Sequence, residues 1–129
     1  MSRRNGGFTL VELLIAIVVI GVLAAIMIPA YGRVKNKGLG ATMVSDLRNL
    51  VTAQENYFLE NSEYYAGALP AAQFEYRVSS GVSVALQDVS IGGWGAVATH
   101  QASEDTCAIY VGTSGPLAPA TAEGVPECN

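Results

Sequence analysis

The chain has 129 residues, half of them hydrophobic, with seven basic and eleven acidic side chains that give a formal net charge of −4. This length allows one domain, and the acidic balance argues against a nucleic-acid-binding protein, which would carry a basic stripe for phosphates. With one histidine, two cysteines and no phosphate-binding loop or nucleophile motif, the sequence also argues against an enzyme and predicts neither a metal ion nor a cofactor.

A long apolar stretch dominates the N-terminal part of the chain. After a polar leader with Arg3 and Arg4, the sequence GGFTLVELLIAIVVIGVLAAIMIPAYG contains one charged residue, Glu12, and residues 13–32 contain none. About 20 apolar residues are needed for an α-helix to cross a hydrocarbon core. The stretch is longer than the apolar core of about 7 to 15 residues in a conventional secretory signal. Because a carboxylate at the centre of a bilayer costs on the order of 2.5 kcal/mol, we expect Glu12 to have a functional partner.

The helical pattern continues beyond the apolar stretch. A basic group, Arg33, Lys35 and Lys37, comes first, and we interpret it as a solvated collar at a membrane or filament interface, with lipid or DNA contact as the alternative. Apolar residues then recur at helical spacing, at Leu39, Met43, Leu47, Leu50, Val51 and Phe58. This stripe predicts an amphipathic continuation over residues 33–60, so that one helix would run for about 53 residues, near 80 Å. Pro29 lacks a backbone N–H, and we expect the helix to bend there.

Residues 61–129 change to the period of β-strands. The segment NSEYYAGALP predicts a surface loop, and strands are predicted at residues 82–91, 93–100 and 106–112, with a fourth at 74–78. Short turns between them favour an antiparallel meander. The predicted fold is therefore α+β, with a long N-terminal helix, apolar and protruding in its first half, packed on a three- to four-stranded antiparallel sheet.

The tail, residues 113–129, is rich in Pro, Gly and Ala and predicts no regular element over much of its length. Cys107 and Cys128 could hold it in place, because export to an oxidising compartment would permit a disulfide. Such a bond would close a loop of about twenty residues and stabilise the chain by roughly 3 kcal/mol.

The N-terminal residues resemble those of a known family. Gly7 is followed by Phe8, Glu12 is the fifth residue beyond Gly7, and Pro29 and Tyr31 lie near the end of the apolar stretch. This combination is similar to that of type IV prepilins and of type II secretion pseudopilins. The resemblance implies a leader at residues 1–7, cleavage between Gly7 and Phe8 by a membrane-embedded prepilin peptidase, and N-methylation of Phe8.

The resemblance also assigns roles within the helix. It implies that residues 8–32 first anchor the chain in the inner membrane and then pack in the core of a filament. Glu12 would pair with the Phe8 amine of a neighbouring copy and so fix the register of assembly. A pair within one chain, or a carboxylate reaching the membrane interface, remains the alternative. The stretch from Gly21 to Pro29 would be unwound in a filament, whereas a plain proline kink is the alternative in the free subunit.

By this resemblance the chain is a structural subunit of an extracellular type IV pilus that serves adhesion, twitching motility or DNA uptake. Its partners would be further copies of itself, the prepilin peptidase and a pilus assembly platform. A first alternative is a type II secretion pseudopilin in a periplasmic pseudopilus. The scattered acidic residues of the C-terminal part form no recognisable calcium-ligand run of the kind that major pseudopilins have. A second alternative is a membrane-anchored binding module that does not polymerise.

Overall fold

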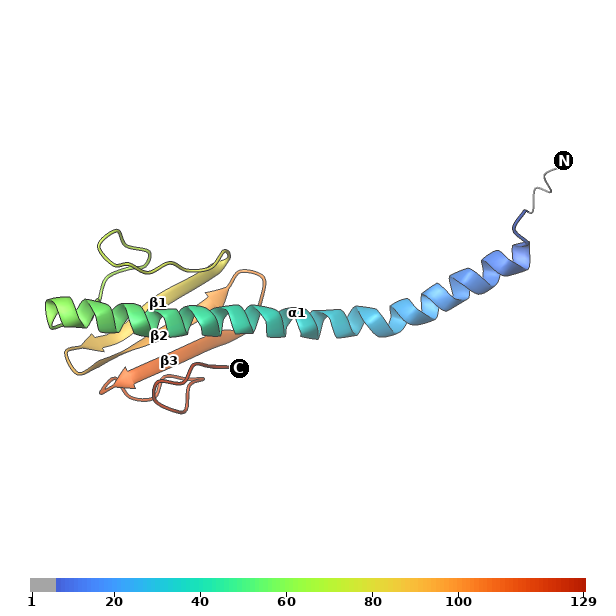
Figure 1. The fold of residues 1–129 in the computed structure, drawn as a ribbon. Helices are drawn as coiled ribbons and strands as arrows, with labels where there is room; N and C mark the ends of the chain where they lie inside the picture. Colours follow the sequence, from blue (N-terminus) through green and yellow to red (C-terminus); the bar gives the residue numbers. More distant parts are fainter. Residues whose placement is uncertain (1–6) are drawn as a thin grey trace. The chain divides into compact units, whose positions relative to one another are not determined.

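The computed structural model describes residues 7–129, so that the predicted leader, apart from Gly7, lies outside the described residues. Figure 1 shows one long helix, α1 (Leu10–Asn61), followed by the strands β1 (Val82–Ser90), β2 (Gly93–His100) and β3 (Thr106–Gly112). A short fourth strand, β4 (Glu127–Cys128), lies next to the C-terminus. The chain forms two compact units, which divide after Lys35, inside α1. We call residues 36–129 the body.

The helix is unbroken over its 52 residues and passes through Pro29 without interruption. It ends at Asn61 because the next residue, Ser62, adopts a positive φ of 59°, a conformation common just beyond helix ends. The Ser62 N–H donates to the Phe58 carbonyl at 2.7 Å, which satisfies one of the last helical carbonyls. The predicted helix over residues 8–60 is thus close to the observed one.

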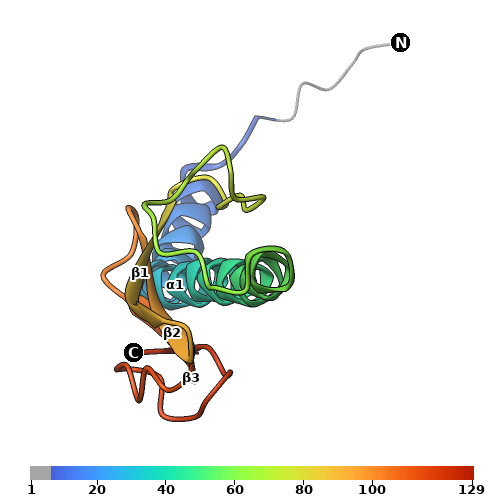
Figure 2. The same cartoon turned by 90° about the vertical axis from the view of Figure 1, so that its left-hand side faces the viewer.

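The four strands form one antiparallel sheet in the order β1-β2-β3-β4. Leu86 pairs with Ala96 and Ala96 with Ile109, so the alternate residues of the three long strands share a face. This face packs on residues 36–61 of α1, and Figure 2 shows the sheet along one side of that helical segment. The predicted α+β fold, with a long helix on a small antiparallel sheet, is confirmed.

The core of the body lies between α1 and this face of the sheet. Met43, Leu47 and Leu50 are fully buried on the helix side. The buried residues that the sheet contributes include Val82, Val84, Trp94, Ala96, Ala98, Cys107 and Ile109. The helical stripe that the sequence predicts is therefore the face of α1 that the sheet covers.

The predicted strand at residues 74–78 is wrong. This segment forms no ladder with a strand, and the fourth strand is instead the short β4, which pairs with β3. Phe74 and Tyr76 are buried, and Phe74 stacks on Tyr65 with ring centroids 4.6 Å apart. The Tyr76 hydroxyl donates to the Asp46 carbonyl at 3.0 Å. Side-chain packing therefore holds this segment, which explains its strand-like alternation of buried and exposed residues.

Two buried polar residues of α1 hold the loop between α1 and β1 at its ends. The Gln54 amide donates to the Tyr65 carbonyl at 2.9 Å and accepts from the Tyr65 N–H at 2.8 Å. The Asp46 carboxylate accepts from the Ser79 N–H and hydroxyl, both at 2.8 Å. Burial, and then the charge of Asp46, raise the pKa of Tyr76 well above its usual value, so its hydroxyl remains a hydrogen-bond donor.

We expect Gln54→Leu to lower the free energy of unfolding by roughly 2 to 4 kcal/mol, because it leaves the buried N–H and carbonyl of Tyr65 without partners. Urea unfolding of the detergent-solubilised protein, followed by Trp94 fluorescence, measures this change. Thr52→Ala, at an exposed position of the same helix, is the matched control. Equal stability of the two variants would contradict the assigned role of Gln54.

Candidate functional site

The N-terminal part of α1 exposes its apolar side chains. The large apolar residues from Phe8 to Val34 have exposed fractions between 50% and 82%. By length and composition this helix could cross a membrane. Such a continuous apolar surface is far larger than those of soluble monomeric proteins, and it is typical of segments that insert into a membrane or associate with another chain.

The first turn of α1 is capped by Thr9. The Glu12 N–H donates to Thr9 Oγ1 at 3.2 Å, and the Leu13 N–H donates to the Thr9 carbonyl at 3.2 Å. Thr9 is therefore the N-cap, and Glu12 is the third residue of the helix. Sequence reasoning missed this cap, although the spacing Thr-x-x-Glu is the signature of a capping box. Glu12 thus lies in the first turn of α1, at the positive end of the helix dipole.

The structure brings Phe8 and Glu12 to the same place. Together with Leu13 and Ala16 they line an open hollow of about 360 Å³ at the start of the helix. Glu12 is the one charged residue between Leu10 and Gly32, so the charge of the apolar helix is concentrated in its first turn. The predicted cleavage site between Gly7 and Phe8 lies just before this turn.

Gly21 and Pro29 both lie inside the continuous helix. The stretch between them is helical throughout in this subunit, with no unwound residue. A side chain added at Gly21 would meet no atom within 4 Å. The expected bend at Pro29, and unwinding between Gly21 and Pro29 in a filament, stay predictions.

Cys107 and Cys128 form a disulfide that joins β3 to β4. It closes the C-terminal loop, as the sequence predicts for an exported chain. The bond lies against the helix at Gly40, where a Cβ would be 3.9 Å from the Sγ of Cys128. This is an ordinary van der Waals distance, so the disulfide lies in contact range of α1 at Gly40.

Two acidic side chains hold the C-terminal loop by accepting hydrogen bonds. Glu123 accepts from the Gly112 N–H at 2.7 Å, and Glu127 accepts from the N–H and hydroxyl of Thr121 at 2.7 and 2.8 Å. Within residues 7–129 no group of three His, Cys, Asp or Glu side chains is placed to hold a metal ion. The loop carboxylates therefore have a structural role in this fold.

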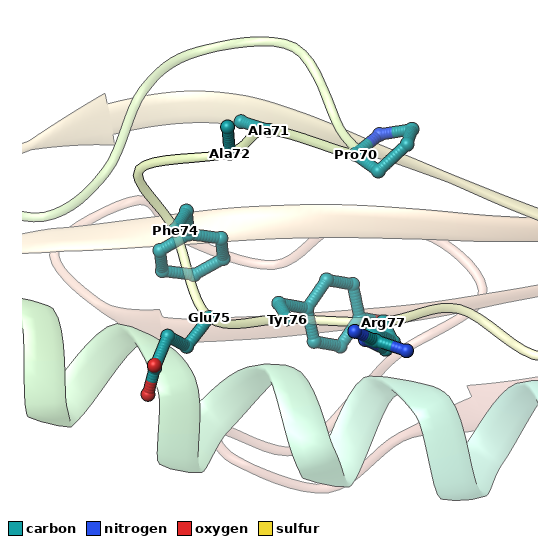
Figure 3. Close-up of a pocket in the computed structure, with 7 residues that line it drawn as sticks. All are labelled: Pro70, Ala71, Ala72, Phe74, Glu75, Tyr76 and Arg77. Atoms are coloured by element: carbon teal, nitrogen blue, oxygen red, sulfur yellow. The ribbon is translucent and has the colours of Figure 1, made fainter.

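The loop between α1 and β1 contains a hollow of about 670 Å³ (Figure 3). One segment of the loop lines it, with Pro70, Ala71, Ala72, Phe74, Glu75, Tyr76 and Arg77. The lining includes one acid and one base, but no histidine, cysteine or serine. It offers no nucleophile with an adjacent base of the kind that covalent catalysis needs.

Comparison with known proteins supports the N-terminal site. A family model described as the prokaryotic N-terminal methylation motif matches residues 2–28. The type IV major pilin protein PilA of Myxococcus xanthus is 37% identical over 86 residues, 61% of this chain and 39% of that protein. Type II secretion system core protein G of Dickeya chrysanthemi is 41% identical over 64 residues, 50% of this chain and 42% of that protein.

A fimbrial protein of Pseudomonas aeruginosa is 42% identical over 68 residues, 53% of this chain and 44% of that protein. The chain therefore spans about two fifths of the length of these relatives. The N-terminal part of the chain, with its methylation motif, is thus similar to type IV pilins and to type II secretion pseudopilins. The resemblance to these two groups of proteins that the sequence shows is confirmed.

Replacing both cysteines by serine should lower the free energy of unfolding by about 3 kcal/mol, because the unfolded chain regains the freedom of a loop of roughly twenty residues. Thermal or urea unfolding of the two proteins measures the difference. As a control, a thiol reductant should destabilise the original chain and leave the double variant unchanged. A reductant effect of similar size on both would contradict a stabilising disulfide.

Proposed function

We propose that this chain is the precursor of a type IV pilin, cut between Gly7 and Phe8, methylated at Phe8 and polymerised through its apolar helix. The observation that carries the proposal is the exposed apolar surface of α1 with its one charge, Glu12, in the turn beside Phe8. The methylation motif over residues 2–28 supports the processing step. The work of the chain would then be structural.

The apolar helix needs one environment before assembly and another after it. Exposure of its side chains to water costs roughly 25 cal/mol for each Å² of apolar surface. In water the helix would therefore aggregate. The inner membrane covers them in the unassembled subunit. In a filament the helices of neighbouring copies cover them instead, so the same surface serves as anchor and as assembly contact. The assembly platform would move the subunit from the first state to the second.

The first turn explains how copies could find a common register. Cleavage before Phe8 creates a positively charged amine, one helical turn from the Glu12 carboxylate. In an apolar filament core both charges are costly unless they are paired. A pair between Glu12 and the Phe8 amine of a neighbour neutralises both and allows one axial offset, much as a buried polar residue fixes register in coiled coils. A pair within one chain would neutralise the charges without fixing the offset.

A pseudopilin of type II secretion is the second candidate, and the likeness to core protein G of Dickeya chrysanthemi favours it. The disulfide-closed C-terminal loop supports the pilin assignment. A pilin would be found in long extracellular filaments that serve adhesion, twitching motility or DNA uptake. A pseudopilin would remain in a short periplasmic fibre. Imaging and fractionation of cells that express the chain distinguish the two.

Mass spectrometry of the protein from its host tests the processing. We expect the mature N-terminus to be a methylated Phe8, because the residues around Gly7 match the methylation motif. Gly7→Val should block cleavage and leave the chain in the membrane. An intact Met1, or a cut beyond Ala30, would exclude the pilin family and favour a membrane-anchored binding module or a conventional secreted protein.

Glu12→Ala should be cleaved but should yield less filament by about tenfold or more, because the buried amine of Phe8 loses its partner. Filament yield in a sheared fraction, measured against total processed subunit, gives the ratio. Thr9→Ala is the matched control: it removes the helix cap, which is worth about 1 kcal/mol, but keeps the charge. Normal filaments from Glu12→Ala, or an equal loss in Thr9→Ala, would contradict the register role.

A further inference from the structure

The basic residues of the described chain are concentrated at one place. Of five basic residues between positions 7 and 129, three lie within five consecutive positions of α1, namely Arg33, Lys35 and Lys37. All three side chains are exposed. They follow directly on the uncharged residues 13–32. The basic group therefore marks the end of the surface that assembly would bury.

The rest of the body has the opposite charge. Residues 38–129 contain ten acidic and two basic side chains, a formal charge of −8. Two of the acids, Glu104 and Asp105, lie in the turn between β2 and β3. This turn lines a hollow of about 440 Å³ together with Asn36 of α1. The acidic turn therefore lies beside the helix at the level of Asn36.

The register of assembly keeps the basic group of one copy near the level of the acidic turn of the next copy. This step rests on the proposed function, in which the Phe8 amine of one copy meets Glu12 of its neighbour. Each residue of the first copy is then level with the residue four positions later in the second, an offset of about 6 Å. Because the two chains are identical and packed side by side, the offset persists along α1. Arg33 of the first copy therefore comes level with position 37 of the second, next to Asn36 and the acidic turn.

We propose that the basic group of one subunit, Arg33, Lys35 and Lys37, docks on the acidic turn, Glu104 and Asp105, of a neighbouring copy of this chain. All three basic positions fall within about two helical turns of Asn36 in the register above, a distance that long flexible side chains can span. Contacts of this kind favour a correct register and disfavour others, and salt screens them. The interface would be a second polar contact between subunits that favours the correct register, about 20 residues or more along the chain from Glu12.

Zero-length cross-linking of native filaments tests this interface, since a carbodiimide joins amines to carboxylates in direct contact. Lys35 and Lys37 are the two lysines of the sequence, so few amines can react. We expect a covalent dimer on a denaturing gel, with a peptide map that joins Lys35 or Lys37 to Glu104 or Asp105. The cross-linked peptides that contain Lys35 or Lys37 should be absent from the peptide map of the variant Glu104→Gln/Asp105→Asn, whereas a link between the Phe8 amine and Glu12 would be unaffected. The same peptides should persist in Asp88→Asn, which removes an exposed acid of β1.

Three results would overturn the interface while leaving the proposed function intact: filaments without such a link, links within one chain, or links to other carboxylates alone. If the double variant does not assemble, the peptide map of the original filaments decides. Binding to vesicles of anionic phospholipid that is lost in Lys35→Gln/Lys37→Gln, without any intersubunit link, would assign the basic group to a lipid surface instead. Absence of filaments, with an uncut N-terminus, would overturn the proposed function and this interface together.

Discussion

The constraint on which the rest of the structure depends is the need to keep about twenty apolar residues of α1 out of water. Within the described residues 7–129 none of these side chains is buried, and the large ones are half or more exposed. The fold of the single subunit does not cover them, and the same helix continues into the body, where its character changes from apolar throughout to amphipathic. The helix thus has an apolar part and an amphipathic part. Glu12 lies at the start of the apolar part, and the basic group at residues 33–37 lies between the two parts.

The body has a small core but two long loops, which need further links to stay folded against it. Its sheet has three full strands and a two-residue fourth, and small domains bury too little apolar surface to be stable without further links. Gln54 and Asp46 hold the loop after α1 through hydrogen bonds to backbone groups and to Ser79. The disulfide, with Glu123 and Glu127, holds the C-terminal loop. The loop after α1 is thus held by polar links together with its buried aromatic residues, and the C-terminal loop by polar and covalent links.

The periodicity of apolar residues predicted the long helix and the three long strands, because these elements depend on residues close together in the sequence. The spacing from Leu39 to Phe58 predicts the buried face of α1, and alternation predicts β1 to β3 within one residue. Residues 74–78 misled because aromatic packing on the helix gives the same alternation as a strand. The pairing of Glu127 with Ala108, and the partners of Gln54 and Asp46, join residues far apart in sequence, so no local period shows them. At the site, the sequence predicts a role for Glu12 because it is the one charge in an apolar stretch. The helix cap at Thr9 could have been predicted from the four-residue pattern Thr-x-x-Glu.

The disulfide has a consequence for the direction of export. A bond between Cys107 and Cys128 does not persist in a reducing cytoplasm, so in a chain exported as proposed the C-terminal loop closes after the body has crossed the membrane. Before crossing, the body lacks about 3 kcal/mol of stability and unfolds more easily. After crossing, oxidation makes unfolding, and therefore return, less favourable by the same amount. In a chain exported as proposed, the disulfide would therefore favour the folded body only on the oxidising side of the membrane.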